Sequence, residues 1–453
     1  MSDNFMVLVK FSINLMINTL KKWCVKFLPE YISYPGKKKS FFTGLIALGM
    51  VATLMFSSVP TYAQNIANLP VFFLSSSAFK QTLLANNSTQ QELRGVWLTN
   101  IDSQVLFGRR RLNAALNRLK QFNFNVVYPT VYNWGYTLYP SKVAKKFIGK
   151  SVDPTPGLRR RDMLKEVVQL GHAKGLRVIP WVEFGFMAPA DSQLVKRNPE
   201  WITSRSDGTK IWKEGIHDRV WLSPFRPDVQ NYMKDLIVEV VKNYDIDGVQ
   251  VDDHFGLPGE LGYDEYTVEL YKKEHSGKAP PKDTKDPEWV KWRADKITDF
   301  MKQLFFAVKE AKQDCVMSVS PNPQRFSYEF FLADWARWER MGLVEELIIQ
   351  LYRNDMNVFV DELERPEVKA ARRHIPVSIG ILTGLKRKYV PIKQVEEQVQ
   401  AVRDRNFAGV SFFFYETLWN MTQERPQKRQ RGFLNIFSAP VKAPSIKEGW
   451  KPV

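Results

Sequence analysis

Eight short apolar runs recur between residues 93 and 415, and they constrain the fold more than any other feature of this chain. Each run is rich in β-branched or aromatic residues, and an amphipathic stretch separates it from the next. Buried parallel strands typically show such near-continuous apolar runs, and strands that alternate with helical patterns indicate a parallel sheet. The runs cover residues 93–99, 125–132, 177–184, 248–253, 316–321, 347–352, 376–382 and 409–415.

The stretches between these runs have helical periodicity. Residues 110–122 place Leu112, Leu116 and Leu119 on one face, and Pro227 is well suited to the first turn of a helix that follows it. A βα unit repeated eight times closes into a (β/α)8 TIM barrel, which we predict for residues 92–420. The rival doubly wound α/β sheet would need a Gly-rich phosphate loop after an early strand, and the sequence has none.

Two segments stand apart from this repeat. The stretch between Gly185 and Asp228 is longer than an ordinary βα loop, and we expect it to wall a cleft. Residues 421–453 contain several Pro and Lys, and they are predicted to form a closing turn and an extended tail, here called the C-terminal extension.

The N-terminal segment is typical of an export signal. Lys37, Lys38 and Lys39 precede an apolar run over 41–56, and small residues then lead to a plausible cleavage site after Ala63. We therefore predict a signal over 1–63 that engages the membrane export machinery, a linker over 64–91, and a periplasmic or extracellular location. The alternative is an uncleaved membrane anchor.

Charge and composition exclude several classes of function. Seven Lys against Asp3 and Glu30 give residues 1–40 a charge of +5, so +12 of the net +17 remains for the rest. This basic body favours anionic partners, but no nucleic-acid-binding motif accompanies it, and we expect no nucleic-acid partner. The two Cys and five His show no metal-ligand spacing, so no metal or other cofactor is predicted. The oligomeric state stays open.

Polar residues follow the ends of the predicted strands, where the catalytic groups of a (β/α)8 barrel lie. Carboxylates at three strand ends, among aromatic and amide side chains, suit glycoside hydrolysis, which needs one carboxylic acid and a second carboxylate. The strand-end candidates are Asn100, Tyr132, Trp134, Trp181, Glu183, Asp252, Asp253, His254, Asn322, Gln350, Tyr352, Tyr415 and Glu416.

Alternation along the fourth strand selects one carboxylate of its Asp pair. Gln250 and Asp252 share one face and the valines share the other, so Asp252 is predicted to point into the barrel as a catalytic carboxylate. Asp253 orients it, contacts substrate or forms a loop hydrogen bond, and His254 is expected to have a structural or sugar-contact role. The general acid is Glu183, whose burial would raise its pKa, or Glu416, unless either pairs with an arginine at the rim.

Several motifs, in order, resemble the glycosyl-hydrolase-10-like family. They are Arg94-Gly95-Val96-Trp97-Leu98-Thr99-Asn100, Trp221-Leu222-Ser223-Pro224, Asp247-Gly248-Val249-Gln250-Val251-Asp252-Asp253-His254-Phe255 and Gly409-Val410-Ser411-Phe412-Phe413 with Tyr415-Glu416. The resemblance covers residues 92–420 and implies an exported bacterial glycosidase, with relatives that cut peptidoglycan glycan strands lacking stem peptides. It implies Asp252 and Asp253 as active-site residues and Arg94, Trp97 and Asn100 as residues that line the site.

The fourth strand also looks like the Asp-Gly-Phe-Arg-x-Asp motif of the alpha-amylase family. The nucleophile of that motif falls on Asp252, but Gln250 stands where the motif has Arg, which places a shared mechanism in doubt.

Three functions remain open from the sequence. The first is a glycoside hydrolase that acts on cell-wall polysaccharide. The second is a non-catalytic glycan-binding protein of the cell envelope, whose tryptophans line a groove. The third is a metal-dependent hydrolase, such as a deacetylase, that uses Asp252, Asp253 and His254.

Overall fold

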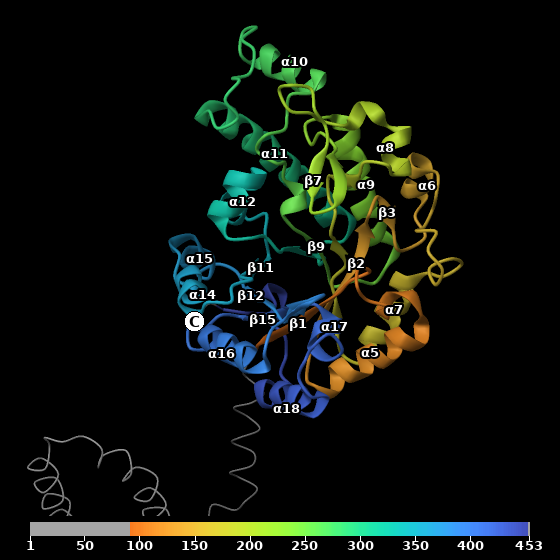
Figure 1. Cartoon of the computed structure of the whole chain (residues 1–453), viewed down its shortest axis with the longest axis vertical. Coiled ribbons are helices and arrows are strands. Elements are labelled where there is room, and N and C mark those ends of the chain that lie inside the picture. The colour runs from red at the N-terminus through yellow and green to blue at the C-terminus, as the bar shows by residue number, and fades with distance from the viewer. Residues whose placement is uncertain (1–90, 452–453) are drawn as a thin grey trace, which may run out of the picture. The chain divides into compact units, whose positions relative to one another are not determined.

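The computed structural model describes residues 91–451 (Figure 1). The predicted signal (residues 1–63) and the predicted linker (64–91), apart from its last residue, lie outside the described residues. Within 91–451 no helix is both long enough and apolar enough to cross a membrane.

A closed barrel of eight parallel strands forms the centre of the described part of the chain, as predicted. The last strand pairs with the first, with Leu93 opposite Gly409, so the sheet closes. In barrel order the strands are β1 (Leu93–Leu98), β2 (Val126–Asn133), β4 (Arg177–Val178) with β5 (Trp181–Val182), β9 (Gly248–Val251), β10 (Val316–Val319), β11 (Glu346–Gln350), β12 (Val377–Leu382) and β15 (Gly409–Phe413).

The third barrel strand is split where the sequence led us to expect one run. β4 and β5 both pair with β2, and Pro180 lies between them. Proline has no N–H to donate to a neighbouring strand, so the ladder is interrupted there.

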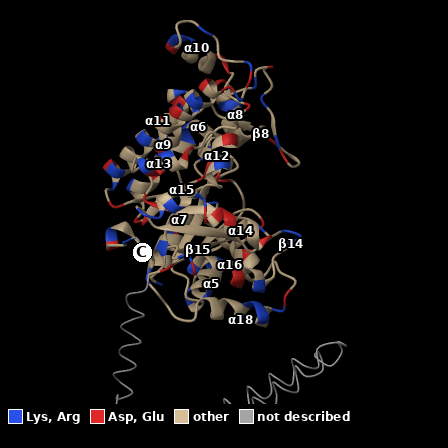
Figure 2. Ribbon diagram, turned by 90° about the vertical axis from the view of Figure 1, so that its left-hand side faces the viewer, with Lys and Arg blue, Asp and Glu red and all other residues tan. Residues whose placement is uncertain are grey.

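Helices cover the outside of the barrel (Figure 1). Each follows a strand and presents its apolar face to the sheet, because the strands need a buried cover on that side. The eight covering helices are α5 (Arg109–Gln121), α7 (Met163–His172), α9 (Pro227–Asn243), α11 (Pro287–Ala311), α13 (Trp335–Arg340), α15 (Pro366–Ala371), α16 (Ile392–Arg403) and α18 (Pro426–Ile436). In Figure 2 the ribbon of these outer helices is marked by many charged residues, in blue and red, whereas the central strands are almost entirely tan.

Helix α18 lies within the predicted C-terminal extension. An extended tail was expected there, but α18 follows the last strand as the eighth covering helix. Its Arg429 is fully buried and donates hydrogen bonds to the carbonyls of Leu418, Val390 and Thr383. The helical barrel architecture therefore extends past residue 420, to residue 436.

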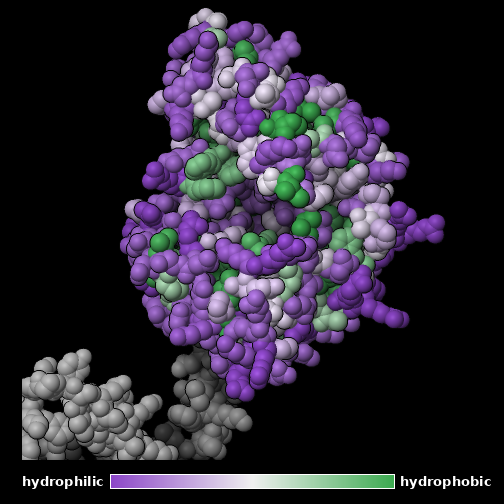
Figure 3. Space-filling model, viewed as in Figure 1, coloured by the Kyte–Doolittle hydropathy of each residue, from purple (hydrophilic) through white to green (hydrophobic). Residues whose placement is uncertain are grey.

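The remaining elements lie mostly in loops after the strands. The segment after β5 holds an antiparallel sheet of β6 (Met187–Pro189), β8 (His217–Trp221) and β7 (Trp212–Glu214), together with α8 (Gln193–Arg197). The other short elements are β3 (Tyr136–Thr137), α6 (Lys142–Ile148), α10 (Glu265–Glu274), α12 (Gln324–Phe331), α14 (Met356–Leu363), β13 (Gly384–Leu385), β14 (Lys388–Tyr389) and α17 (Tyr415–Trp419). Figure 3 shows the surface hollowed over β9, between these loop elements.

The barrel interior holds a chain of hydrogen bonds among aromatic rings. Trp97 Nε1 donates to Gln250 (2.7 Å), and Gln250 donates to Ser318 (3.0 Å). Ser318 and Tyr128 both donate to the buried carboxylate of Glu346, at 2.9 and 3.0 Å. Buried polar groups are tolerated when each finds a partner, so this chain lets the interior carry polar residues at little cost.

The base of the barrel, where the strands begin, is covered by the segment after α18. Gln91 bridges to Lys442, and the side chain of Asn125 donates to the carbonyl of Val441 (3.1 Å). Ala443 is buried with the rings of the barrel interior. Within the described residues this segment covers the base of the barrel, and the hollow seen in Figure 3 lies where the strands finish.

Candidate active site

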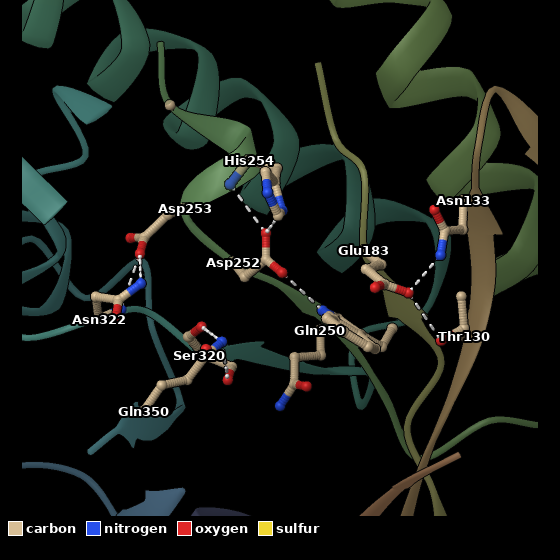
Figure 4. Close-up of polar contacts among 12 residues, drawn as sticks. Thr130, Asn133, Glu183, Gln250, Asp252, Asp253, His254, Ser320, Asn322 and Gln350 are labelled. Carbon is tan, nitrogen blue, oxygen red and sulfur yellow. Dashed lines mark hydrogen bonds and ion pairs between the residues drawn. The ribbon is translucent and has the colours of Figure 1, made fainter. Parts of the chain in front are cut away.

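Asp252 lies at the centre of the site, directly after β9 (Figure 4). Gln250 reaches Trp97 and Ser318 across the barrel interior, so the face that Gln250 shares with Asp252 is the inner one, as predicted. One oxygen of Asp252 accepts from Trp181 Nε1 (3.1 Å), and the other accepts from the backbone N (2.9 Å) and Nδ1 (3.0 Å) of His254. Donors of this kind stabilise a carboxylate and fix its orientation.

Glu183 follows β5, the neighbouring strand, and is partly buried. Its Oε2 accepts from Asn133 Nδ2 (2.7 Å) and from Thr130 Oγ1 (3.2 Å). Burial, and after it the negative charge of Asp252, raise the pKa of Glu183 to about 8. Glu183 is therefore mostly a neutral carboxylic acid at pH 7, which is the state that a general acid needs.

His254 carries the positive charge of the site. Burial lowers the pKa of His254, but Asp252, Glu183 and Asp253 together outweigh it and raise the pKa to about 9. Its ring lies 6.1 Å from the ring of Phe184 and 6.0 Å from that of Trp221. The protonated His254 ring therefore donates a hydrogen bond to Asp252, and the rings of Phe184 and Trp221 pack beside the His254 ring.

One glycine contact and one backbone hydrogen bond fix the loops that follow β5 and β9 against each other. Gly185 has φ +48°, and a Cβ there would lie 2.4 Å from the carbonyl oxygen of His254. The backbone N of Phe186 donates to that same oxygen (2.8 Å). The segments that carry Glu183 and His254 are therefore fixed relative to each other by backbone contacts.

Asp253 points away from this cluster (Figure 4). Its Oδ2 accepts from the backbone N (2.9 Å) and Nδ2 (2.6 Å) of Asn322, and burial raises its pKa. Asp252, Asp253 and His254 consequently do not converge on one point. Within residues 91–451 no group of three His, Cys, Asp or Glu side chains is arranged to hold a metal ion.

Most of the other predicted site residues lie at or near this cluster. Trp97 is beneath it, with its ring 6.3 Å from that of Trp181, and Asn100 accepts a hydrogen bond (2.9 Å) from Asn133. Gln350 donates to Ser320, and the ring of Tyr352 lies 5.6 Å from that of Phe413. Burial raises the pKa of Tyr352, and the charges of Asp252 and Glu183 add to the effect, so its hydroxyl stays protonated.

Trp134 marks the rim of the site. The guanidinium of Arg219 lies over the rings of both Trp134 (4.8 Å) and Phe184 (5.1 Å). Arg219 comes from β8, so the antiparallel sheet in the loop after β5 packs against the mouth of the barrel, as expected of a segment that walls a cleft.

The structure does not bring Arg94 to the site. Arg94 lies on the outer face of β1, bonds Glu92 (2.7 Å) and stacks on Phe437 at the base of the barrel. Alternation along β1 explains this placement, because Arg94 and Trp97 are three residues apart and therefore face opposite sides.

Three other predicted residues are also placed elsewhere. Tyr132 faces outward and meets the hydroxyl of Tyr232 on α9 (3.4 Å). Glu416 opens α17 and accepts from Ser103 (3.0 Å) and Asn420, with no contact to the Asp252 cluster. Tyr415 is buried beside Arg118 of α5. Of the two candidate acids, the geometry therefore favours Glu183 over Glu416.

The sequence did not identify Thr130 and Asn133 as site residues, although both contact Glu183. The pairing of β2 with β5 shifts register between Thr130 and Tyr132, so the simple alternation that would place Tyr132 inward breaks there and Asn133 points inward instead. In the sequence, the position of Asn133 directly after a predicted strand is the feature that could have indicated its place in the site.

Comparison with known families identifies the barrel. The model of the family described as Glycosyl hydrolase-like 10 matches residues 92–401, which is more than half of the chain. The chain belongs to this family. The match covers most of the barrel, including Glu183 and Asp252, and confirms the resemblance seen in the motifs.

Two curated relatives share about a quarter or less of their residues with this chain. The chain is 23% identical over 309 residues to the glycosyl hydrolase DigH of Escherichia coli K12, covering 58% of this chain and 66% of that protein. It is 22% identical over 296 residues to the glycosyl hydrolase YngK of Bacillus subtilis, covering 59% of this chain and 56% of that protein. The chain thus spans slightly less than two thirds of one relative and little over half of the other.

Solved structures share the fold of this glycosyl hydrolase-like barrel. The glycoside hydrolase domain of PgaB (BpsB) from Bordetella bronchiseptica superposes with a TM-score of 0.54 at 16% identity, covering 74% of this chain and all of that domain (100%). The catalytic domain of a beta-amylase from Paenibacillus polymyxa gives 0.53 at 10% identity, covering 77% and 99%. At this identity the likeness shows the fold alone.

Proposed function

We propose that this protein is a glycosidase that cleaves cell-wall polysaccharide, with Glu183 as general acid and Asp252 as the second carboxylate. One observation carries the proposal. Two carboxyl groups follow neighbouring strands at the open end of the barrel, and their surroundings differ. Burial and the charge of Asp252 raise the pKa of Glu183 to about 8, whereas Asp252 accepts hydrogen bonds from Trp181 Nε1 and from two N–H groups of His254.

The reaction follows from this arrangement of Glu183 and Asp252. Glu183 donates its proton to the glycosidic oxygen as the bond to the leaving sugar breaks, and Asp252 either attacks the anomeric carbon or activates a water. Trp181 and His254 hold Asp252 in place by hydrogen bonds, so that its carboxylate is oriented toward the sugar as the sugar acquires positive charge.

For the substrate we propose peptidoglycan glycan strands that lack stem peptides. The support is the resemblance of the sequence motifs to the family, which implies this specificity, and a basic body that suits an anionic wall polymer. The same proposal places the protein outside the cytoplasm, and it rests on the signal pattern of residues 1–63.

The test is a digestion assay with the purified protein. Bare glycan strands and strands with stem peptides are incubated separately, and the soluble products are identified by mass. We expect products from bare strands, about 10²–10⁴-fold slower release with Glu183→Gln, and none with Asp252→Asn.

Asp361→Asn on the surface of α14 serves as the matched control, and we expect its activity to equal that of the wild type. Full activity in Asp252→Asn would contradict the proposed mechanism. Tight binding of intact strands with no products from the wild type would instead support the non-catalytic glycan-binding alternative.

A further inference from the structure

Helix α12, which follows β10 at the open end of the barrel, exposes two stacked phenylalanine rings. Phe326 is 40% exposed and Phe330 is 57% exposed, and their ring centroids lie 4.7 Å apart at an interplanar angle of 28°. They are four residues apart, so they occupy the same face of the helix. Figure 3 shows a hydrophobic patch over α12, at the rim of the recess above β9.

These rings are continuous with the active site. The ring of Phe331 lies 6.0 Å from that of Phe326 on one side and 6.4 Å from that of His254 on the other. Single exposed apolar residues are common and need no explanation. Here the exposed rings extend a row of aromatic side chains that begins at the imidazolium beside Asp252.

Helix α12 is also held rigidly to the loop that carries His254. The carbonyls of Phe331 and Phe330 accept from the backbone N of Leu257 (2.7 Å) and of Gly259 (3.0 Å). At Gly256, two residues after His254, an added Cβ would lie 2.1 Å from the carbonyl oxygen of Phe331. The exposed rings therefore keep a fixed position relative to the catalytic groups, which lowers the entropic cost of binding a ligand across both.

We propose that Phe326 and Phe330 form a stacking platform for a sugar ring of the glycan chain where the chain leaves the cleft past His254. The proposal rests on the proposed glycosidase function and adds a distal binding subsite to it. The apolar face of a pyranose buries well against an aromatic ring, and the ion pair of Arg325 with Glu329 (2.9 Å) supplies polar groups beside the rings for hydroxyl or amide groups of the sugar.

Other occupants fit this surface less well. The two partly exposed rings present roughly 150–250 Å² of apolar area, whereas a stable protein interface buries about 800 Å² on each side, so a second copy of the chain is not favoured. An anionic membrane would be expected to meet a cluster of unpaired basic residues. Here Arg325 is paired with Glu329 in the same helix.

The test separates binding from cleavage. The full chain carrying Asp252→Asn is titrated with long bare glycan strands and with the shortest oligosaccharide that the wild type cleaves. Adding Phe326→Ala and Phe330→Ala together should weaken binding of long strands about tenfold and leave the short oligosaccharide within twofold. In the protein with Asp252 intact, the double Ala substitution should lower kcat/KM for long strands and leave kcat/KM for the short oligosaccharide nearly unchanged.

Two variants control the experiment. Phe306→Ala removes a ring that is 56% exposed on α11, and it should change the affinity for neither the long strands nor the short oligosaccharide. Replacement of Phe326 and Phe330 by Tyr keeps the ring faces and should restore binding of long strands.

The proposal is overturned if the double Ala variant binds long strands as the Phe306→Ala control does, or if the Tyr variant fails to restore binding. The proposal is also overturned if the double Ala variant loses only self-association, measured by sedimentation, or only binding to anionic lipid vesicles. Either result would assign the rings to that partner. If the wild type cleaves no glycan, the proposed function fails, but the titration of long strands still tests the platform.

Discussion

Glu183 holds its proton because of where its side chain lies. Partial burial disfavours its charged form, and Asp252 on the next strand adds a negative charge, so its pKa rises to about 8. The hydrogen bond from Thr130 works in the other direction, because an O–H donor favours a carboxylate. The pKa of Glu183 is therefore the result of opposing contributions, each of which can be altered by a single substitution.

This balance predicts the alkaline limit of activity. A general acid works while protonated, so kcat/KM should be high below about pH 8 and fall as pH rises through the pKa of Glu183. Thr130→Val removes the donor and keeps the side-chain shape, so the pKa should rise and the limb should move upward by roughly 0.5–1 pH unit. The measurement is a pH profile of kcat/KM for both proteins, and a downward shift would contradict this account of Glu183.

Sequence reasoning at this scale succeeded where alternation was unbroken. Asp252 could be placed because Gln250 and Asp252 are two polar residues on one face of a short strand. Asn133 could not be placed, because a register shift in the pairing of β2 with β5 is set by contacts between strands and leaves no mark on a single strand. The assignment of Arg94 to the site conflicted with the alternation that puts Trp97 inside.

At the scale of elements, the barrel strands and covering helices were predictable because burial and period are local features of the chain. The sheet of β6, β8 and β7 was not predicted as a sheet, although the length of its segment was recognised. The position of α12 against the loop after β9 depends on backbone contacts across more than seventy residues, and only the structure reveals them.

Gly256 offers a test of how tightly these elements are joined. In Gly256→Ala the new methyl group would lie 2.1 Å from the carbonyl oxygen of Phe331, so α12 or the loop must move. We expect a loss of about 1–3 kcal/mol in the free energy of unfolding, measured in urea, together with reduced kcat/KM. Gly108→Ala is the control, since its methyl group would meet only the flexible end of the Arg111 side chain. Equal stability of the two variants would show that the contact is not tight.

At the scale of the whole molecule, Phe437 lies at the base of the barrel, where the first and last strands of the sheet meet. It is fully buried, and its ring packs on Phe124 (5.2 Å) and Phe412 (5.9 Å) beneath Arg94. Phe437→Ala should cost about 3–5 kcal/mol of unfolding free energy in urea, because it leaves a cavity at this junction. Ile446→Ala, at a side chain that is 43% exposed, should change stability by less than about 0.5 kcal/mol. A small effect of Phe437→Ala would mean that the base closes without this ring.

The pairing of β1 with β15 also determines when the barrel can close during biosynthesis. A chain that emerges with its N-terminus first presents β1 early, but one edge of β1 waits for Gly409–Phe413, and the bridge from Gln91 waits for Lys442. Until then the nascent sheet has two open edges, which are templates for aggregation. A ribosome that stalls or a chain that is truncated before residue 413 therefore releases an open sheet, and the cell must shield more than three hundred residues of unfinished barrel until the last strand arrives.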